Sequence, residues 1–213
     1  MDVLVAGGHG KVALRLLGLL AAQGHRARGL IRKAEQAADL EALGAVATLG
    51  DLEADADLAG YLQDADAVVF AAGAGPGSGP ERKRTVDLGG AVKLVDAALA
   101  VGVRRYVMVS SIGADRPQAA SGGMRPYLEA KAGADQYLTA SGLDYTIVRP
   151  GSLTDGPGTG RVRLTTDLGN RGAVPRDDVA AVIAEVLDAP NTIGVTFELF
   201  SGEVPVAEAV RSL

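Results

Sequence analysis

The sequence predicts an α/β protein of one domain, built on a three-layer, doubly wound parallel sheet. Over the first 150 residues, short apolar runs of Val, Ile, Leu and Ala alternate with helical patterns. Near-continuous apolar strands are typical of parallel sheets covered on both faces, and short links between the elements favour right-handed βαβ units. After Pro150 the composition shifts to Gly, Thr and Pro. We therefore expect a cofactor-binding core over residues 1–150 and a small substrate-side extension over 151–213.

The apolar runs place the strands in order along the chain. We expect strands at Val3–Ala6, Ala27–Ile31, Ala45–Leu49, Ala65–Gly73, Arg104–Ser111, Asp144–Pro150 and Thr196–Phe200. The Gly-rich loop at Gly73–Gly79 is predicted to be mobile.

Apolar residues at helical spacing place the helices between these strands. We expect helices at Lys11–Ala22, Lys33–Leu43, Thr85–Ala100, Pro126 to about Ala140, and Asp177–Ala189, with a short helix at the C-terminus. Gly24, Gly44 and Gly102 stand where left-handed residues end helices. Asp177 is a candidate N-cap.

Composition excludes several classes of function. The chain has no Cys and two His among 213 residues, so it predicts no disulfide, no thiolate catalysis and no multi-histidine or Cys-ligated metal site. The net charge is −5 without a basic cluster, which argues against nucleic-acid binding. We see no secretory leader and no apolar stretch near the roughly 20 residues that span a bilayer. The expectation is a cytoplasmic protein without a membrane partner.

The stretch GGHGKVA joins the first strand to the first helix. Gly7, Gly10 and Ala13 follow the spacing G-x-x-G-x-x-A, in which bare backbone admits a diphosphate to the helix N-terminus and a small third residue lets the helix pack closely. We expect dinucleotide binding here. Its predicted contacts are Gly7, Gly8, His9, Gly10, Lys11 and Val12, with His9 either a phosphate donor or an exposed loop residue.

The end of the second strand indicates which dinucleotide binds. NAD-binding proteins commonly place Asp or Glu there to hold the ribose 2′-hydroxyl, whereas this chain has Arg32 and Lys33. A guanidinium can grip a 2′-phosphate through two hydrogen bonds. These cations also oppose the dipole of the helix that they open, which favours a ligand. We predict a preference for NADP(H), with NAD(H) possible.

Other cofactor contacts are expected at the ends of the later strands. Asp51 either accepts from the adenine amino group or forms a simple turn as the N-cap of the next helix, and Leu52 covers the adenine ring. Backbone beneath the ribose is predicted at Ala71, Ala72 and Gly73. The stretch RPGSLTDGPGTG (149–160), which includes Pro150, either walls the nicotinamide side and admits substrate or is an ordinary surface connection. In ERKRTVD (81–87) three cations either attract phosphates or an acidic substrate, or form a solvated helix start.

Candidate catalytic residues lie on the fifth strand and the helix after it. Ser110 and Ser111 end the strand, and Tyr127 and Lys131 are four residues apart, on one face of a helix. A free phenol has a pKa of about 10, but an ammonium, an oxidised nicotinamide and a helix N-terminus all stabilise phenolate. A serine hydroxyl can orient a carbonyl while tyrosine passes a proton and lysine holds ribose hydroxyls. The set predicts hydride transfer coupled to proton transfer. The alternative is that Tyr127 is a surface residue beside the loop Ser121–Arg125, and that Lys131 alone acts by holding ribose hydroxyls.

The motifs VAGGHGKVA, YLEAK, SGLDYTIVRPG and FELFSG resemble the atypical short-chain dehydrogenase/reductase family, in its NAD(P)H-binding, sugar-epimerase-like branch. The resemblance covers nearly the whole chain and implies a Rossmann fold with bound NADP(H). Family motifs carry to Gly7, Gly10 and Ala13, to Tyr127 and Lys131, and to Ser110 or Ser111. Ala13 departs from the commoner glycine. Only about 60 residues follow Pro150, which makes a nucleotide-sugar substrate less expected than in larger epimerases.

These observations predict an NADP(H)-dependent oxidoreductase that reduces a small carbonyl, quinone or flavin-like substrate. Two alternatives stay open: a regulatory protein that senses NADPH without turnover, and a sugar epimerase or dehydratase that returns the hydride to its own product. The expected partner is a small-molecule substrate, and the chain is expected to be a monomer or a homodimer.

Overall fold

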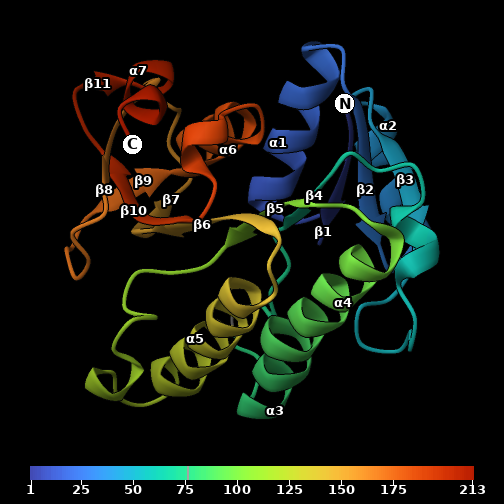
Figure 1. Cartoon of the computed structure of the whole chain (residues 1–213), viewed down its shortest axis with the longest axis horizontal. Helices are drawn as coiled ribbons and strands as arrows, with labels where there is room; N and C mark the ends of the chain where they lie inside the picture. Colours follow the sequence, from blue (N-terminus) through green and yellow to red (C-terminus); the bar gives the residue numbers. More distant parts are fainter. Residues whose placement is uncertain (76) are drawn as a thin grey trace.

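In the computed structural model, which describes residues 1–75 and 77–213, a nine-stranded sheet forms the centre of the molecule (Figure 1). The strand order is β11-β8-β10-β6-β5-β4-β1-β2-β3. A separate pair, β7 and β9, lies beside it. The strands are β1 (Asp2–Ala6), β2 (Arg26–Ile31), β3 (Val46–Leu49), β4 (Ala67–Phe70), β5 (Arg105–Val109), β6 (Asp144–Pro150), β7 (Ser152–Thr154), β8 (Arg161–Thr165), β9 (Ala173–Pro175), β10 (Val195–Ser201) and β11 (Val204–Pro205).

Helices connect these strands and cover both faces of the sheet. The α-helices are α1 (Lys11–Ala22), α2 (Ala37–Glu41), α3 (Pro80–Arg82), α4 (Ala91–Val101), α5 (Met124–Ala140), α6 (Arg176–Leu187) and α7 (Val206–Arg211). Segment η3 (Lys83–Gly90) is a π-helix that joins α3 to α4. Short 3-10 turns are η1 (Ala34–Gln36), η2 (Ala59–Leu62), η4 (Pro117–Ala119) and η5 (Pro190–Thr192). None of the helices in the described ranges is long and apolar enough to cross a membrane.

Alternate residues of each central strand supply two separate hydrophobic cores. On β1, Val3 and Val5 belong to the core that contains side chains of α1, α6 and α7, whereas Leu4 and Ala6 belong to the core that contains side chains of η3, α4 and α5. Figure 1 shows these two helical layers on opposite sides of the sheet. The parallel strands from β3 to β10 confirm the predicted three-layer, doubly wound fold. All their carboxyl ends therefore meet at one edge, where ligands bind in such sheets.

The chain after Pro150 adds strands that the sequence pattern did not predict. β8 pairs antiparallel with β10 and with β11, and β7 pairs in parallel with β9. These strands are only two to five residues long, and most of their side chains are exposed. Such short, solvated strands leave no apolar run in the sequence.

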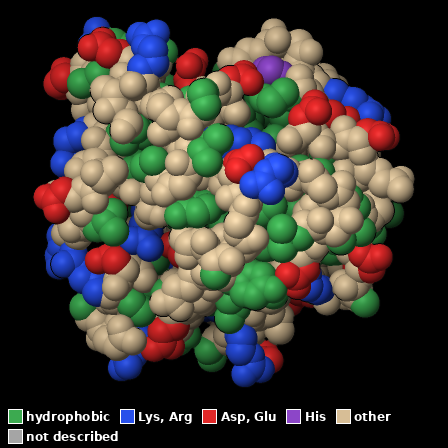
Figure 2. Space-filling model, viewed as in Figure 1, with side chains coloured by type: hydrophobic (Ala, Val, Ile, Leu, Met, Phe, Trp, Pro, Cys, Tyr) green, Lys and Arg blue, Asp and Glu red, His purple; other side chains and the backbone are tan. Residues whose placement is uncertain are grey.

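On the face of the molecule in Figure 2, acidic and basic side chains are intermixed.

Several helix boundaries differ from the predictions. The helix expected at Lys33–Leu43 is a 3-10 turn followed by the five-residue α2, of which Leu40 alone is buried, so little packing supports a longer helix. The helix expected to start at Thr85 starts at Pro80, behind Gly79. Asp177 is not an N-cap, because Pro175 holds that place and Asp177 lies in the first turn.

Two further limits of the predicted elements matter for the site. β4 ends at Phe70 and β5 at Val109, so the glycine-rich and serine residues that follow them lie in loops at the ligand-binding edge. In addition, α5 begins at Met124, which places Pro126 within its first turn, where no intrahelical N–H is needed. The predicted mobile loop Gly73–Gly79 contains Pro76, which lies outside the described residues.

Candidate cofactor site and active site

Two adjoining cavities open along the carboxyl edge of the parallel strands. The first has a volume of about 290 Å³ and lies over the ends of β1, β2 and β3. The second has a volume of about 1050 Å³ and extends from the amino end of α1 to α5 and β7. Both are lined by Gly10 and by Ala71, Ala72 and Gly73. Together they form one elongated site, which suits a long dinucleotide with a second molecule at one end.

The turn after β1 requires glycine for a steric reason. Gly7 has a φ of +79°, and a Cβ built on it would lie 2.6 Å from the Cα atom of Ala72. The Gly10 amide donates a hydrogen bond to the Gly7 carbonyl, 2.8 Å away, which closes the turn. The loops after β1 and β4 therefore meet backbone to backbone. This contact leaves the floor shared by both cavities without side-chain bulk.

The amino end of α1 faces the second cavity and presents unpaired positive polarity to it. Gly10 is its N-cap, and neither a capping side chain nor an acidic residue of the first turn is present among the described residues. Gly10, Lys11 and Val12 line this cavity. The first amides of a helix have no partner within the helix, and its dipole favours an anion there. This geometry suits a diphosphate held by backbone amides.

Two of the predicted cofactor contacts lie elsewhere. Gly8 lines neither cavity; its amide donates to the Leu30 carbonyl at 2.9 Å, and an added Cβ would lie 2.7 Å from the Gly29 Cα. Gly8 therefore serves the close packing of the turn against β2. Lys33 also lines neither cavity: its ammonium lies 3.4 Å from the Glu35 carboxylate, in solvent. The chain turns after Arg32, so the two neighbouring cations point to different places.

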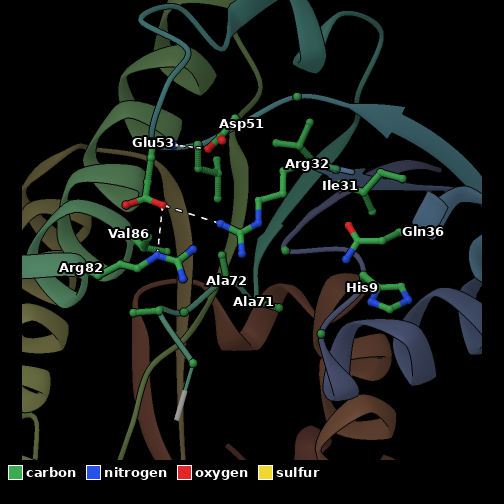
Figure 3. A pocket seen from close by; sticks show the side chains of 18 residues that line it. His9, Ile31, Arg32, Gln36, Asp51, Glu53, Ala71, Ala72, Arg82 and Val86 are labelled. Carbon is green, nitrogen blue, oxygen red and sulfur yellow. Dashed lines mark hydrogen bonds and ion pairs between the residues drawn. The ribbon is translucent and has the colours of Figure 1, made fainter. Parts of the chain in front are cut away.

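The first cavity is lined by the other residues that were predicted to contact the adenosine half of the cofactor (Figure 3). Arg32 and His9 line it, and the His9 Nε2 atom lies 2.7 Å from the Asp39 carboxylate. Leu52 is buried in its wall. Asp51 also lines the cavity, and its Oδ1 atom accepts the Glu53 amide at 2.8 Å. Asp51 thus forms a turn but caps no helix, because the N-cap of the next helical segment, η2, is Leu58.

Two charged residues that the sequence analysis did not single out complete this cavity. Glu53 and Arg82 line it beside Arg32, and Figure 3 shows the Glu53 carboxylate joined by dashed lines to both guanidinium groups. Arg82 belongs to the cationic stretch 81–87, whose charges were recognised without being assigned to individual contacts. Glu53 follows GDL in a loop, where nothing in the sequence indicates which way a carboxylate turns.

In the second cavity, Lys131 is held in a buried position beside Tyr127. The Lys131 ammonium donates to the Val109 carbonyl at 3.0 Å and lies 3.5 Å from Oδ1 of Asp87. It also lies 5.5 Å from the ring centre of Phe70 and 6.0 Å from that of Tyr127. The Lys131 side chain is only 4% exposed. A buried ammonium needs a counter-charge, and Asp87 supplies it.

Asp87 itself was not predicted as a site residue. It lies on η3, is fully buried, and accepts the Ala74 amide at 3.1 Å through Oδ2. Its Oδ1 atom has no hydrogen-bond partner among the described residues. Since Asp87 and Lys131 both line the second cavity, the pair presents a charged floor there. In the sequence, an acidic residue within a helix that has an apolar face was the signal that could have revealed Asp87.

The two candidate serines have different surroundings. The Ser110 hydroxyl donates to the Asp135 carboxylate at 2.8 Å, and Arg149 donates to the same oxygen at 3.0 Å. Burial raises the pKa of the Asp135 carboxyl, and the Arg149 charge opposes that rise. Ser111 is half-buried, and its hydroxyl donates to the Ile112 carbonyl at 3.1 Å. Both serines line the second cavity, but the Ser110 proton is directed away from it.

The remaining wall of the second cavity is formed by Pro150 and by polar groups at its rim. The Asp155 carboxylate accepts from Lys11 at 2.9 Å and from Arg176 at 2.8 Å. Both cations lower the pKa of Asp155, the Lys11 hydrogen bond most of all. Lys11 and Arg176 line the cavity. Across the described ranges, no group of three or more His, Cys, Asp or Glu residues could hold a metal ion.

Comparison with known proteins agrees with this geometry. The sequence profile described as NAD(P)H-binding matches residues 7–190. The chain is 41% identical over 215 residues to an uncharacterized sugar epimerase, YhfK, of Bacillus subtilis, with both chains fully covered. It is 42% identical, with both chains fully covered and a TM-score of 0.96, to a Bacillus halodurans structure provisionally described as an NAD-dependent epimerase/dehydratase. It is 27% identical, with a TM-score of 0.79, to ChuY, an anaerobillin reductase of Escherichia coli O157:H7, covering 96% and 98% of the two chains.

The contact between Gly7 and Ala72 leads to a mutational prediction. Gly7→Ala and Gly24→Ala both place alanine at positive φ, which costs about 1–2 kcal/mol, but Gly24 has no atom within 4 Å of an added Cβ. We expect Gly7→Ala to lower the free energy of unfolding more than Gly24→Ala does, and to abolish nucleotide binding. Urea denaturation and nucleotide titration measure the two effects. Equal losses in the two variants would contradict the steric argument.

Proposed function

The chain belongs to the NAD(P)H-binding family, and on that premise we propose that it is an oxidoreductase that uses NADPH to reduce a small carbonyl, quinone or flavin-like substrate. The observation that supports this proposal best is that Tyr127, Lys131 and Ser111 line one cavity together with the amino end of α1. A phosphate-binding turn is thereby placed next to proton-donating groups. The name of the related ChuY protein, a reductase, agrees with this reaction class.

Each residue at the active site has a distinct part in the proposed reaction. When bound, the dihydronicotinamide ring supplies the hydride. Tyr127 donates a proton from its phenol to the substrate oxygen, and Ser111 orients that oxygen by a hydrogen bond. Lys131 holds ribose hydroxyls through its ammonium, which Asp87 keeps in place at 3.5 Å. The apolar wall formed by Pro150, Leu153 and Met124 excludes water from the reacting atoms.

The proposed cofactor is NADP(H) rather than NAD(H), and Arg32 supports this preference. Its side chain lines the first cavity at the end of β2 and is 47% exposed, so it is accessible to a ligand. It donates no hydrogen bond to any residue that the structure describes, and its ion-pair partner Glu53 lies 3.9 Å from Nη1. No acidic residue follows β2 directly, where NAD-binding proteins hold the ribose 2′-hydroxyl.

Epimerase chemistry is a second candidate, favoured by the name of the Bacillus subtilis relative. The same tyrosine, lysine and serine would then remove a hydride and return it to the product. The two proposals differ in one measurable respect, because an epimerase consumes no NADPH over a complete turnover. Incubation with NADPH and a panel of quinones, aldehydes and flavins identifies a reductase by its consumption of NADPH, which neither an epimerase nor a protein that only senses NADPH would show.

Arg32 provides the first test of the cofactor preference. We expect Arg32→Ala to weaken NADPH binding about tenfold, since a hydrogen-bonded charge pair is lost, and to leave NADH binding nearly unchanged. The matched control is Lys33→Ala, which removes the neighbouring cation outside both cavities. Calorimetric titration with both nucleotides measures the effect. A preference for NADPH that survives in Arg32→Ala would disprove this assignment.

Tyr127 provides the test of the chemical step. We expect Tyr127→Phe to lower kcat about 100-fold or more, as befits loss of a general acid, with the dissociation constant for NADPH unchanged. Tyr137→Phe is the control, because Tyr137 lies on the same helix but donates to Asp96 on the surface. Steady-state kinetics with a substrate found in the panel measures kcat. Undiminished turnover in Tyr127→Phe removes this residue from the mechanism.

A further inference from the structure

A carboxylate occupies the centre of the cation cluster in the first cavity. The Oε2 atom of Glu53 lies 3.3 Å from Nε of Arg82 and 3.9 Å from Nη1 of Arg32. Its Oε1 atom accepts the Thr85 hydroxyl at 2.6 Å. Figure 3 shows both guanidinium groups directed to the same oxygen of this carboxylate. Two guanidinium groups and a hydroxyl are a donor set that also suits a phosphate group.

The chain holds Glu53 in this position through its backbone. The Glu53 amide donates to Asp51 at 2.8 Å, and Lys93 donates to the Glu53 carbonyl at 3.2 Å. The side chain beyond this anchored backbone is 30% exposed, and those of Arg32 and Arg82 are 47% and 37% exposed. The carboxylate therefore lies in open contact with the cavity, where a ligand can replace it without unpacking the core.

The two arginines come from different parts of the chain. Arg32 follows β2, whereas Arg82 ends α3, the short helix before η3. The segment of Arg82 also contributes Val86 to the first cavity and Asp87 to the second. A ligand held by both arginines would thus connect the β2 loop to the segment that carries the counter-ion of Lys131.

We propose that Arg82 is a second residue that binds the 2′-phosphate of NADP(H), and that Glu53 occupies the space between Arg82 and Arg32 until this phosphate displaces its carboxylate. The inference rests on the proposed use of NADP(H) in this cavity. A phosphate monoester carries a charge of about −1.5 to −2 at neutral pH, against −1 for the carboxylate. The phosphate therefore attracts both guanidinium groups more strongly than Glu53 does, and a 2′-hydroxyl does not.

The like charge of Glu53 has a second consequence. A carboxylate that must move away from two guanidinium groups, or stay beside a phosphate, weakens the binding of NADPH relative to a neutral residue. NADH has no phosphate at this position, so its binding depends much less on Glu53 and Arg82. Glu53 and Arg82 thus change the affinity for NADPH much more than the affinity for NADH, and in this way they determine the specificity for the cofactor.

The experiment is calorimetric titration of the full chain with NADPH and NADH, for Arg82→Ala, Glu53→Gln and the control Arg84→Ala. Arg84 lies two residues from Arg82, pairs with Glu81 on the surface and lines neither cavity. We expect Arg82→Ala to weaken NADPH binding about tenfold and Glu53→Gln to tighten it. NADH binding changes less than twofold in all three variants, which also shows that they are folded, and Arg84→Ala binds both nucleotides like the unmodified chain.

Arg82 has no such role if Arg82→Ala binds NADPH as tightly as Arg84→Ala does, or if it loses NADPH and NADH equally. Weaker binding of NADPH to Glu53→Gln shows that the carboxylate organises the arginines instead of competing with the phosphate, and overturns that half of the inference. The Arg32→Ala variant separates this inference from the proposed function. If the preference for NADPH is lost on changing Arg32 but not Arg82, the cofactor assignment stands and the inference fails. If the preference for NADPH is lost on changing Arg82 but not Arg32, the result supports the proposed role of Arg82 and shows that Arg32 does not determine the preference.

Discussion

The close contact between the loops after β1 and β4 is the constraint on which the rest of the site depends. Gly7 and Ala72 meet backbone to backbone, with no room for a Cβ at Gly7. This contact aligns the amino end of α1 with the floor of both cavities. A single side chain at Gly7 would separate the two loops and fill the path along which a dinucleotide lies. The fold thus places the main-chain amides of the helix N-terminus beside this floor, a geometry that suits an anion.

Charge is distributed differently at the two ends of this site. In the first cavity the arginines are partly exposed around Glu53, so their partner is exchangeable. In the second cavity Lys131 and Asp87 are buried, and their pairing is permanent, because separating them would leave an unpaired charge in an apolar surrounding. An exchangeable cluster suits recognition of one nucleotide over another. A buried pair suits a fixed position for the groups next to the reaction.

The fold could be predicted from the sequence because strand and helix periodicity, and glycines at turn positions, are local properties. The same holds for the glycine turn and for the spacing of Tyr127 and Lys131. The missed features depend on tertiary contacts: Glu53 and Arg82 are 29 residues apart and meet only after folding, and Asp87 is recognised only by its distance to Lys131. Gly8 and Lys33, predicted as cofactor contacts, line neither cavity, because spacing places a residue in a turn but does not show which way it points.

The most direct test of the central claim is a crystal structure of this chain with NADPH. The account predicts that the diphosphate lies within hydrogen-bond distance of the backbone amides at the amino end of α1, over the contact between Gly7 and Ala72. A diphosphate bound elsewhere, or no bound nucleotide at saturating NADPH, would contradict it.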